Sequence, residues 1–332
     1  MLTILIAGHN LHFIKNLVEL FEQEGHTVLI DLWQGHYKHD ETQSLTKLSN
    51  ADLIICEWAL GNSVWYSNNV KEHQRLFIRF HRQEIETDYP AKINIDSVEK
   101  IVFVSPFFQS KAIELFEIPM HKTTFIPNYV KTDDFSISKT KNAKFTIGML
   151  GIIPQMKRFD LGLDILRNLQ QHDSRYNLRI KGKLPKDYEW MIKRELEMKW
   201  YESQFSRIQT DNQLINKVHF DDWGDDVAEW FENIGFILSV SDFEGTHQAV
   251  AEGTVSGAFP MILKWPGADS IYPKSWCYKD AESITNSILN HSTRKSLRKK
   301  HAKKIIEKYD VKIIYHKWCE LIGKTPIGAI ND

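Results

Sequence analysis

The sequence is poor in the features that mark several classes of protein. It has only three cysteines in 332 residues, Cys56, Cys277 and Cys319, which lie far apart and in no metal-ligand spacing. Such cysteines indicate reduced thiols in a cytosolic protein rather than a disulfide framework. The formal net charge is −1. Because bulk nucleic-acid binding requires a strong basic excess, no nucleic-acid partner is expected.

Long apolar runs are also missing. No stretch of about 18 apolar residues is present that could cross a membrane as a helix. The apolar run 2–7 is too short for a signal peptide and leads straight into a glycine turn. The sequence therefore predicts a soluble, cytoplasmic protein that is at most peripheral to a membrane.

The residues that are present fit two α/β domains. Hydrophobic residues make up 42% of the chain and aromatic residues 12%, enough to bury two cores of roughly 130–180 residues each. Short apolar runs alternate with amphipathic stretches of helix length, as in parallel sheets with crossover helices. Strands are predicted at 2–7, 27–32, 51–56, 75–81, 100–105, 123–126, 145–150, 176–181, 217–220, 235–240 and 259–264. The predicted fold class is α/β, with two Rossmann-like domains.

A polar segment divides the chain. Residues 131–144 are rich in Lys, Asp, Ser and Thr and poor in apolar side chains, which favours a linker. We place the N-terminal domain at 1–135, the linker at 136–144 and the C-terminal domain at 145–308. The remaining residues, 309–332, contain an amphipathic stretch and are predicted to form a separate C-terminal helix.

The most informative pattern is a pair of glutamates. Glu244 and Glu252 are separated by seven residues and lie between two predicted strands. A helix beginning near Gly245 would set both carboxylates near one face, because their spacing is a little over two turns. Glu244 would lie at the strand-to-helix turn, where free N–H groups and the helix dipole attract phosphate. This arrangement predicts a nucleotide-sugar site, and a solvated helix face is the alternative explanation of the bare spacing.

The segment resembles the donor-site signature of the retaining glycosyltransferases of family 4. Three other segments resemble that family in the same order: a strand with a serine at 100–110, an Ile-Pro-Asn segment at 125–135, and a glycine-rich strand with a lysine-containing loop at 148–160. The resemblance implies a GT-B fold, with two domains facing each other across a cleft and the C-terminal helix crossing back to the first. It also implies an acceptor-side first domain, shorter here than usual, and a second domain that binds the nucleotide-sugar donor.

The resemblance assigns roles around the two glutamates. Glu244 would contact the transferred sugar near its reacting face, and Glu252 would hold the ribose hydroxyls. The family usually has Gly-Phe-Gly after the first glutamate, whereas this chain has Gly245, Thr246 and His247, whose backbone amides would face the diphosphate. His247 is interpreted as a phosphate or acceptor contact, or alternatively as a helix-start histidine without a role.

Two basic residues are candidates for stabilising the leaving group. Lys157 and Arg158 follow a predicted strand, a glycine and a proline, so they lie where open α/β sheets bind ligands. They would neutralise the charge that develops on a departing diphosphate. The family usually has an arginine directly after the glycine, where this chain has Ile152. Either Arg158 replaces that arginine or phosphate binding is weaker, and a solvated pair at a helix start is the alternative.

Two further candidates lie in the first domain. His81 ends a predicted strand, and the family often has a histidine there that faces the transferred sugar. Gly8 follows the first predicted strand and resembles the glycine turn that lets the backbone approach the donor. A structural role is the alternative for both residues.

The acidic run 221–226 invites a metal interpretation. However, no Asp-x-Asp sequence occurs in the chain, and GT-B enzymes generally bring no metal to the diphosphate. We therefore predict no metal and no cofactor, and expect Asp225 or Asp226 to cap the following helix. Trp223, by its position in the family, would lie near the nucleobase.

The run from Arg294 to Lys304 is densely basic and predicted to be helical. A solvated face is the simpler interpretation. The alternative is peripheral contact with an anionic membrane, at the inner face of the cell membrane, or with an anionic polymer acceptor.

Together these features predict a retaining, metal-independent hexosyltransferase. Its donor would be a nucleotide-diphosphate sugar, with a UDP-sugar favoured. Its acceptor would be a glycan or polyol phosphate of the cell envelope, which implies a role in polysaccharide biosynthesis. Two alternatives stay open: a catalytically silent GT-B subunit that binds acceptor for a partner transferase, and a GT-B nucleotide-sugar epimerase.

Overall fold

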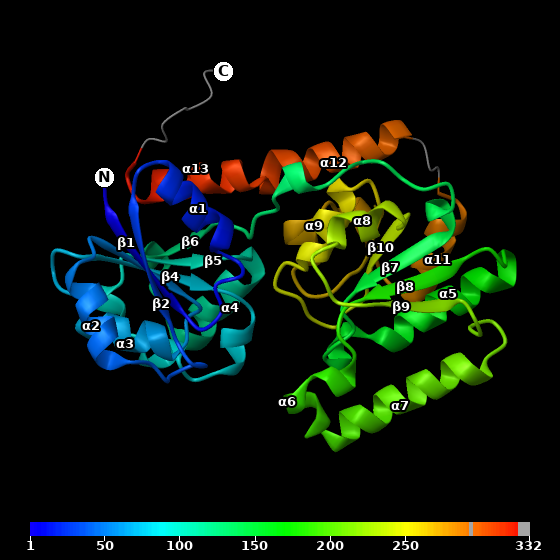
Figure 1. Ribbon diagram of the computed structural model, residues 1–332, viewed down its shortest axis with the longest axis horizontal. Helices are drawn as coiled ribbons and strands as arrows, with labels where there is room; N and C mark the ends of the chain where they lie inside the picture. The colour runs from blue at the N-terminus through cyan, green and yellow to red at the C-terminus, as the bar shows by residue number, and fades with distance from the viewer. Residues whose placement is uncertain (292–294, 325–332) are drawn as a thin grey trace. The chain divides into compact units, whose positions relative to one another are not determined.

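The computed structural model describes residues 1–291 and 295–324, so Arg294 and the end of the C-terminal segment lie outside the described residues. Contacts divide the chain into two compact units. Unit 1 comprises Met1–Tyr129 and Tyr309–Asp332, and unit 2 comprises Val130–Lys308. Each unit contains one six-stranded sheet (Figure 1).

Unit 1 has a fully parallel sheet with the strand order β2-β1-β3-β4-β5-β6. The strands are β1 (Thr3–Gly8), β2 (Thr27–Leu32), β3 (Leu53–Glu57), β4 (Arg75–Phe80), β5 (Lys100–Phe103) and β6 (Thr123–Phe125). The α-helices are α1 (Lys15–Gln23), α2 (Glu41–Ser49), α3 (Gly61–Asn69), α4 (Pro106–Phe116) and α13 (Val311–Leu321).

Both faces of strands β1, β3, β4 and β5 are buried, which explains why these strands consist mostly of apolar residues. Successive strand residues point to opposite faces. Ile4 packs with residues of α1 and α13 on one face, and Leu5 packs with residues of α2, α3 and α4 on the other. Trp318 of α13 is only 1% exposed, so α13 is part of the unit 1 core.

Unit 2 has the strand order β12-β11-β10-β7-β8-β9, again with parallel neighbours. The strands are β7 (Thr146–Leu150), β8 (Asn177–Lys181), β9 (Val218–Asp221), β10 (Phe236–Ser239), β11 (Phe259–Leu263) and β12 (Cys277–Tyr278). The α-helices are α5 (Phe159–His172), α6 (Glu189–Ile192), α7 (Glu195–Thr210), α8 (Val227–Glu232), α9 (Gln248–Val255), α10 (Ala268–Ile271), α11 (Ala281–Leu289) and α12 (Lys295–Tyr309).

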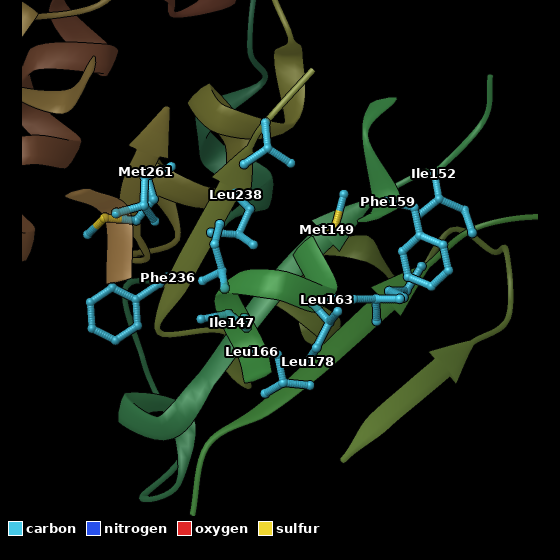
Figure 2. Packing of buried hydrophobic residues seen from close by; sticks show 14 of the residues in the cluster. Ile147, Met149, Ile152, Phe159, Leu163, Leu166, Leu178, Phe236, Leu238 and Met261 are labelled. Carbon is cyan, nitrogen blue, oxygen red and sulfur yellow. The ribbon is translucent and has the colours of Figure 1, made fainter. Parts of the chain in front are cut away.

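The main core of unit 2 lies between its sheet and helices α5 and α11 (Figure 2). Phe159, Leu163 and Leu166 of α5 recur at the spacing of one helical face and pack on strand residues such as Ile147 and Leu178. A smaller cluster around Phe231 of α8 covers the opposite face. The sheet therefore lies between two layers of helices, and the loops lie at the ends of its strands.

All eleven predicted strands are found, with ends that differ from the predicted ones by at most two residues. The sequence did not predict β12, because a pair of residues carries no hydrophobic periodicity. Residues 131–144 belong to unit 2, where Ala143 is buried and the amine of Lys139 donates a hydrogen bond to the Phe231 carbonyl. Within the part of the chain that the structure describes, no helix is long and apolar enough to span a membrane.

Candidate functional site

The candidate site of unit 2 lies where β7 and β10 are neighbours. Chain order runs outward from β7 through β8 and β9 on one side, and from β10 through β11 and β12 on the other. Open α/β sheets bind ligands at such a switch point, beyond the carboxyl ends of the strands. The loop after β7 and the loop after β10 meet there, and the Asp242 N–H donates a hydrogen bond to the Met156 carbonyl at 2.9 Å.

Lys157 and Glu244 come together in these two loops. Nζ of Lys157 lies 2.5 Å from Oε1 of Glu244, and the Ser241 hydroxyl donates to the same oxygen at 2.6 Å. Glu244 is buried, with 8% of the residue exposed. Burial opposes its ionisation, but attraction to His247 and Lys157 and the two hydrogen bonds outweigh burial and lower the pKa of Glu244 to about 2. The site therefore holds a fixed anion beside a cation.

His247 is the third member of this cluster. Its Nδ1 lies 2.5 Å from the Ser239 hydroxyl oxygen and 3.7 Å from Oε1 of Glu244, and its Nε2 is buried with no hydrogen-bond partner in the part of the chain that the structure describes. Burial lowers the pKa of His247 to about 4, although Glu244 opposes this shift and Lys157 adds to it. The imidazole is therefore neutral at pH 7.

The backbone at His247 is held in an unusual conformation. Its φ is 40°, in the left-handed region that residues with a Cβ rarely adopt. The Tyr272 hydroxyl donates to the Thr246 carbonyl at 2.7 Å and to the His247 carbonyl at 3.2 Å. The Trp265 indole N–H donates to the Ser239 hydroxyl at 3.0 Å. These contacts hold the turn that follows β10.

Helix α9 begins at Gln248, three residues later than predicted. The expectation that Glu244 shares a helix face with Glu252 is therefore wrong, because the left-handed turn at His247 delays the helix. Gly245 and Thr246 precede it in the same loop. Burial raises the pKa of Glu252 to about 7, against the hydrogen bond with Gln248. Glu252 is thus a carboxyl poised between its two protonation states near neutral pH.

Arg158 is already neutralised by carboxylates. Its guanidinium donates to Asp160 at 2.9 and 3.0 Å and to Asp242 at 2.9 Å. The hydrogen bond from Arg158 to Asp160 is the main cause of a raised pKa of the guanidinium, which the bond to Asp242 reinforces. A phosphate would have to compete with both acids for Arg158, whereas Lys157 has a single carboxylate partner.

The acidic run after β9 has a different role from the predicted cap. Asp226 is the residue before α8, but its side chain makes no cap hydrogen bond. It pairs at 2.8 Å with the amine of Lys181, which is 3% exposed and needs an anion. Trp223 is 67% exposed, and the Lys183 amine lies 5.3 Å from its ring centroid. Its predicted nearness to a nucleobase stays a prediction.

His81 of unit 1 is built into a buried charge network. It follows β4, and its Nε2 lies 2.9 Å from Oε1 of Glu57. Arg79 donates to both oxygens of Glu57, at 3.0 and 2.8 Å. Burial opposes ionisation of Glu57, but Arg79 and His81 lower its pKa below the usual range. Glu57 thereby fixes the His81 ring, whose Nδ1 bonds to no described residue.

Gly8 and Trp58 lie directly beside this network. A Cβ at Gly8 would lie 2.7 Å from the Glu57 carbonyl oxygen, so only glycine fits. Trp58, with a φ of 76°, stacks on the His81 ring with centroids 4.1 Å apart. The glycine therefore has a packing reason in the structure, and the predicted approach of its backbone to a donor stays a prediction.

Sequence reasoning missed the residues that position the predicted ones. Ser239 and Ser241 hold His247 and Glu244, and Glu57 holds His81. A signal was present, because each of these polar residues comes at or directly after the carboxyl end of an apolar strand, where ligand sites form. Among residues 1–291 and 295–324, no group of three or more His, Cys, Asp or Glu is arranged to hold a metal ion. Metal independence stays a prediction.

No protein-family model matches the chain, and no curated protein matches it. Solved structures do match. HepE (Alr3699) of Anabaena, in complex with UDP and glucose, has a TM-score of 0.72 at 14% identity, over 97% of this chain and 100% of HepE. A glycosyltransferase from Rickettsia africae ESF-5 has a TM-score of 0.72 at 15% identity, over 96% and 97% of the two chains.

A third match is a mutant of TarM from S. aureus in complex with fondaparinux, alpha-GlcNAc-glycerol and UDP. Its TM-score is 0.60 at 16% identity, and the match covers 87% of this chain and 60% of TarM. At such identities the likeness concerns the fold alone. This chain has the two-domain α/β GT-B fold that these glycosyltransferases share.

Proposed function

We propose that this chain is a retaining glycosyltransferase of family 4 that transfers a hexose from a nucleotide-diphosphate sugar without a metal ion. The observation that carries the proposal is the Lys157–Glu244 pair at the switch point of the unit 2 sheet, with His247 beside it. Such a site combines a cation for a departing diphosphate with an anion for a sugar that becomes positively charged. The UDP and glucose bound in HepE support a UDP-sugar as the favoured donor.

Donor binding would rearrange the pair. The diphosphate carries more negative charge than one carboxylate, so it attracts Lys157 away from Glu244. Glu244, which stays ionised at neutral pH because of its low pKa, then faces the reacting carbon of the sugar. Both charges act most strongly when the glycosidic bond is breaking, which is when catalysis needs them.

The other predicted contacts with the donor follow from the position of the Lys157–Glu244 pair at the switch point of the sheet. The backbone amides of Gly245, Thr246 and His247 would bind the diphosphate at the start of α9. Glu252 would accept hydrogen bonds from the ribose hydroxyls once it is ionised, and Trp223 would contact the nucleobase. In a retaining reaction of this type the acceptor attacks the face that the leaving group departs from. The departing phosphate takes the acceptor's proton, so no side chain needs to act as a base.

Unit 1 would serve the acceptor side. We assign His81 to the transferred sugar, oriented by its hydrogen bond with Glu57, and the Gly8 turn to the approach of the donor. The acceptor is a glycan or polyol phosphate of the cell envelope, reached from the cytoplasm. The alpha-GlcNAc-glycerol bound together with UDP in the TarM complex supports an acceptor of the polyol class.

The test begins with binding. A ligand that binds only the folded protein raises its melting temperature, so UDP-, GDP- and ADP-sugars are compared by thermal unfolding, and a rise with a UDP-sugar is expected. The protein is then incubated with that donor and a glycerol-phosphate polymer or glycan acceptor. Nuclear magnetic resonance of the product should show the anomeric configuration of the donor.

Each other outcome has a distinct meaning. An inverted product overturns retention, and loss of activity in a metal chelator overturns metal independence. Free epimerised nucleotide sugar without acceptor indicates the epimerase. Acceptor binding without any donor binding indicates the silent subunit. If no nucleotide sugar changes the melting temperature, the proposed donor site is wrong.

A further inference from the structure

A second cluster of basic groups lies at the amino ends of β10 and β11, far along the sheet from the Lys157–Glu244 pair. Phe236 and Phe259 are the first residues of these strands. The His291 ring lies 3.9 Å from the Phe259 ring, and the Arg298 guanidinium lies 5.5 Å above it. His301 contacts the same phenyl ring at 5.7 Å.

Lys139 completes the cluster. Its amine donates to the Phe231 carbonyl at 2.6 Å, and its Cε would lie 3.4 Å from a Cβ placed at Gly257, just before β11. Four groups that can carry positive charge therefore come together from three segments of unit 2: the chain before β7, the segment after α11, and α12. Among the residues that the structure describes, Glu232 is the one acid that acts on any of these groups, through Lys139.

The interior face of α12 was not predicted. The sequence favoured a solvated basic helix, and this is right for Lys295, Lys299, Lys300, Lys303 and Lys304, which are exposed. It is wrong for Arg298 and His301, which are half-buried against the end of the sheet because α12 packs with that face inward. Arg294 lies outside the described residues.

Three nitrogens of this cluster are buried and have no hydrogen-bond partner among the described residues: Nε of Arg298, Nε2 of His291 and Nδ1 of His301. Arg298 forms no hydrogen bond or ion pair with any described residue, and its contact is the face of Phe259. Leaving buried polar or charged groups unpaired is costly, so native packing normally supplies them with partners. An anion bound beside these nitrogens would supply the missing acceptor.

The electrostatics agree with this geometry. Burial, with a smaller contribution from Arg298, lowers the pKa of Lys139 to about 7. Burial also lowers the pKa of His301 to about 4, with smaller contributions from His291, Lys304 and Lys300. Burial also lowers the pKa of Arg298, and burial and Arg298 lower that of His291. Every group is thus destabilised in its charged form, and a bound anion would reverse each of these shifts.

We propose that Arg298, His291, His301 and Lys139 form a binding site for a phosphate group, separate from the Lys157–Glu244 site. A guanidinium fork binds two oxygens of a phosphate in parallel, and each imidazole can donate a hydrogen bond to another oxygen through its N–H group. Because four groups converge, the site can balance the two charges of a phosphate monoester as well as the one charge of a diester. The exposed lysines of α12 attract anions toward it. The inference does not depend on the proposed function.

The test uses inorganic phosphate as the probe and the full chain. Phosphate affinity is measured by isothermal titration calorimetry at pH 6 and at constant ionic strength set with chloride. The Lys157→Ala variant is the background, because it removes the other cation that a phosphate could find. Arg298→Gln is expected to weaken binding tenfold or more. Lys303→Gln is the matched control, since it removes a charge from the exposed face of the same helix, where Lys303 pairs with Glu307 at 3.5 Å.

Affinity should also fall as pH rises from 6 to 8, because Lys139, whose pKa is about 7, loses its proton over that range. If Arg298→Gln does not fold, His301→Asn takes its place, with an expected loss of threefold or more. The proposal is overturned if the background protein binds phosphate no better than chloride, or if Lys303→Gln loses as much affinity as the site variants.

The source of the phosphate is decided with three further probes: glycerol phosphate, vesicles of phosphatidylglycerol, and vesicles of phosphatidylcholine. Binding to the anionic vesicles alone, lost in Arg298→Gln, supports a lipid headgroup as the ligand. Binding to glycerol phosphate but not to vesicles supports a soluble phosphate compound. Equal vesicle binding by the background protein and Arg298→Gln would show that the lysine face acts alone and would contradict the site for lipids.

Discussion

Lys157 Nζ lies 2.5 Å from Glu244 Oε1, although 87 residues separate them in the chain. The Glu244 side chain is 11% exposed and that of Lys157 22%, so water screens the pair only in part. Neither residue lies in an α-helix: Lys157 ends a short 3-10 helix after β7, and Glu244 lies in the loop after the neighbouring strand β10. The pair therefore forms because β7 and β10 are neighbours in the sheet.

Replacement of Lys157 tests the leaving-group role. Lys157→Ala removes a charge-assisted contact worth roughly 1.5–3 kcal/mol, or about 10–10²-fold. The loss should appear in both donor affinity and turnover, measured by calorimetry and by initial rates. Lys279→Ala is the control, because its side chain is 83% exposed in the same unit. Similar kinetics for the two variants would contradict the role of Lys157.

Replacement of Glu244 separates sugar chemistry from nucleotide binding. Glu244→Gln keeps the size of the side chain but removes its charge, so turnover should fall on the order of 10²-fold or more. UDP affinity should stay the same or rise, because Lys157 is freed from its carboxylate partner. Kinetics and UDP titrations on one preparation check both parts. Near-normal sugar transfer by a folded Glu244→Gln protein would refute the assignment.

Glu252 should make stability depend on pH. Its folded pKa of about 7 lies above the ordinary value of 4.5, so the folded state binds more protons than the unfolded state between these values. The free energy of unfolding therefore falls as pH rises from about 4.5 to about 7, and the full cost is present above 7. Glu252→Gln should not show this fall.

The effect is checked by urea unfolding at pH 5 and pH 8. The difference between wild type and Glu252→Gln should change by on the order of 1 kcal/mol between these pH values, which allows for the partial exposure of the side chain. Glu282→Gln, in an exposed position of α11, should run parallel to wild type. A parallel profile for Glu252→Gln as well would mean that the carboxyl is not destabilised by burial.

The Glu57–Arg79 pair should be essential to unit 1 as a pair. Glu57→Gln leaves a guanidinium that is 1% exposed without its counter-ion, and breaking a buried pair costs roughly 3–5 kcal/mol. The double variant Glu57→Leu/Arg79→Met removes both charges and should recover part of that loss. Chemical denaturation of the wild type, Glu57→Gln and the double variant measures their free energies of unfolding. A double variant less stable than Glu57→Gln would contradict this account.

The sequence by itself determined which segments form strands and that these strands belong to parallel sheets. Apolar runs of strand length, such as those that became β1 and β10, must be buried on both faces, and alternation with amphipathic helices leaves parallel sheets as the solution. It also determined that Lys157 and Glu244 lie in loops after strands. The resemblance to family 4 supplied their roles, which local sequence physics alone does not contain.

Tertiary structure decided which loops meet and which charges are already paired. The order β10-β7 brings Glu244 to Lys157, and no sequence pattern states that order. Asp242 accepts a hydrogen bond from Arg158, and Ser239 forms a hydrogen bond with His247. These side chains are 84 and 8 residues apart in the chain, and the fold brings them together. The inward turn of Arg298 has the same origin. Periodicity shows which residues can be buried, but the energy of an ion pair depends on distances that only the packed chain sets.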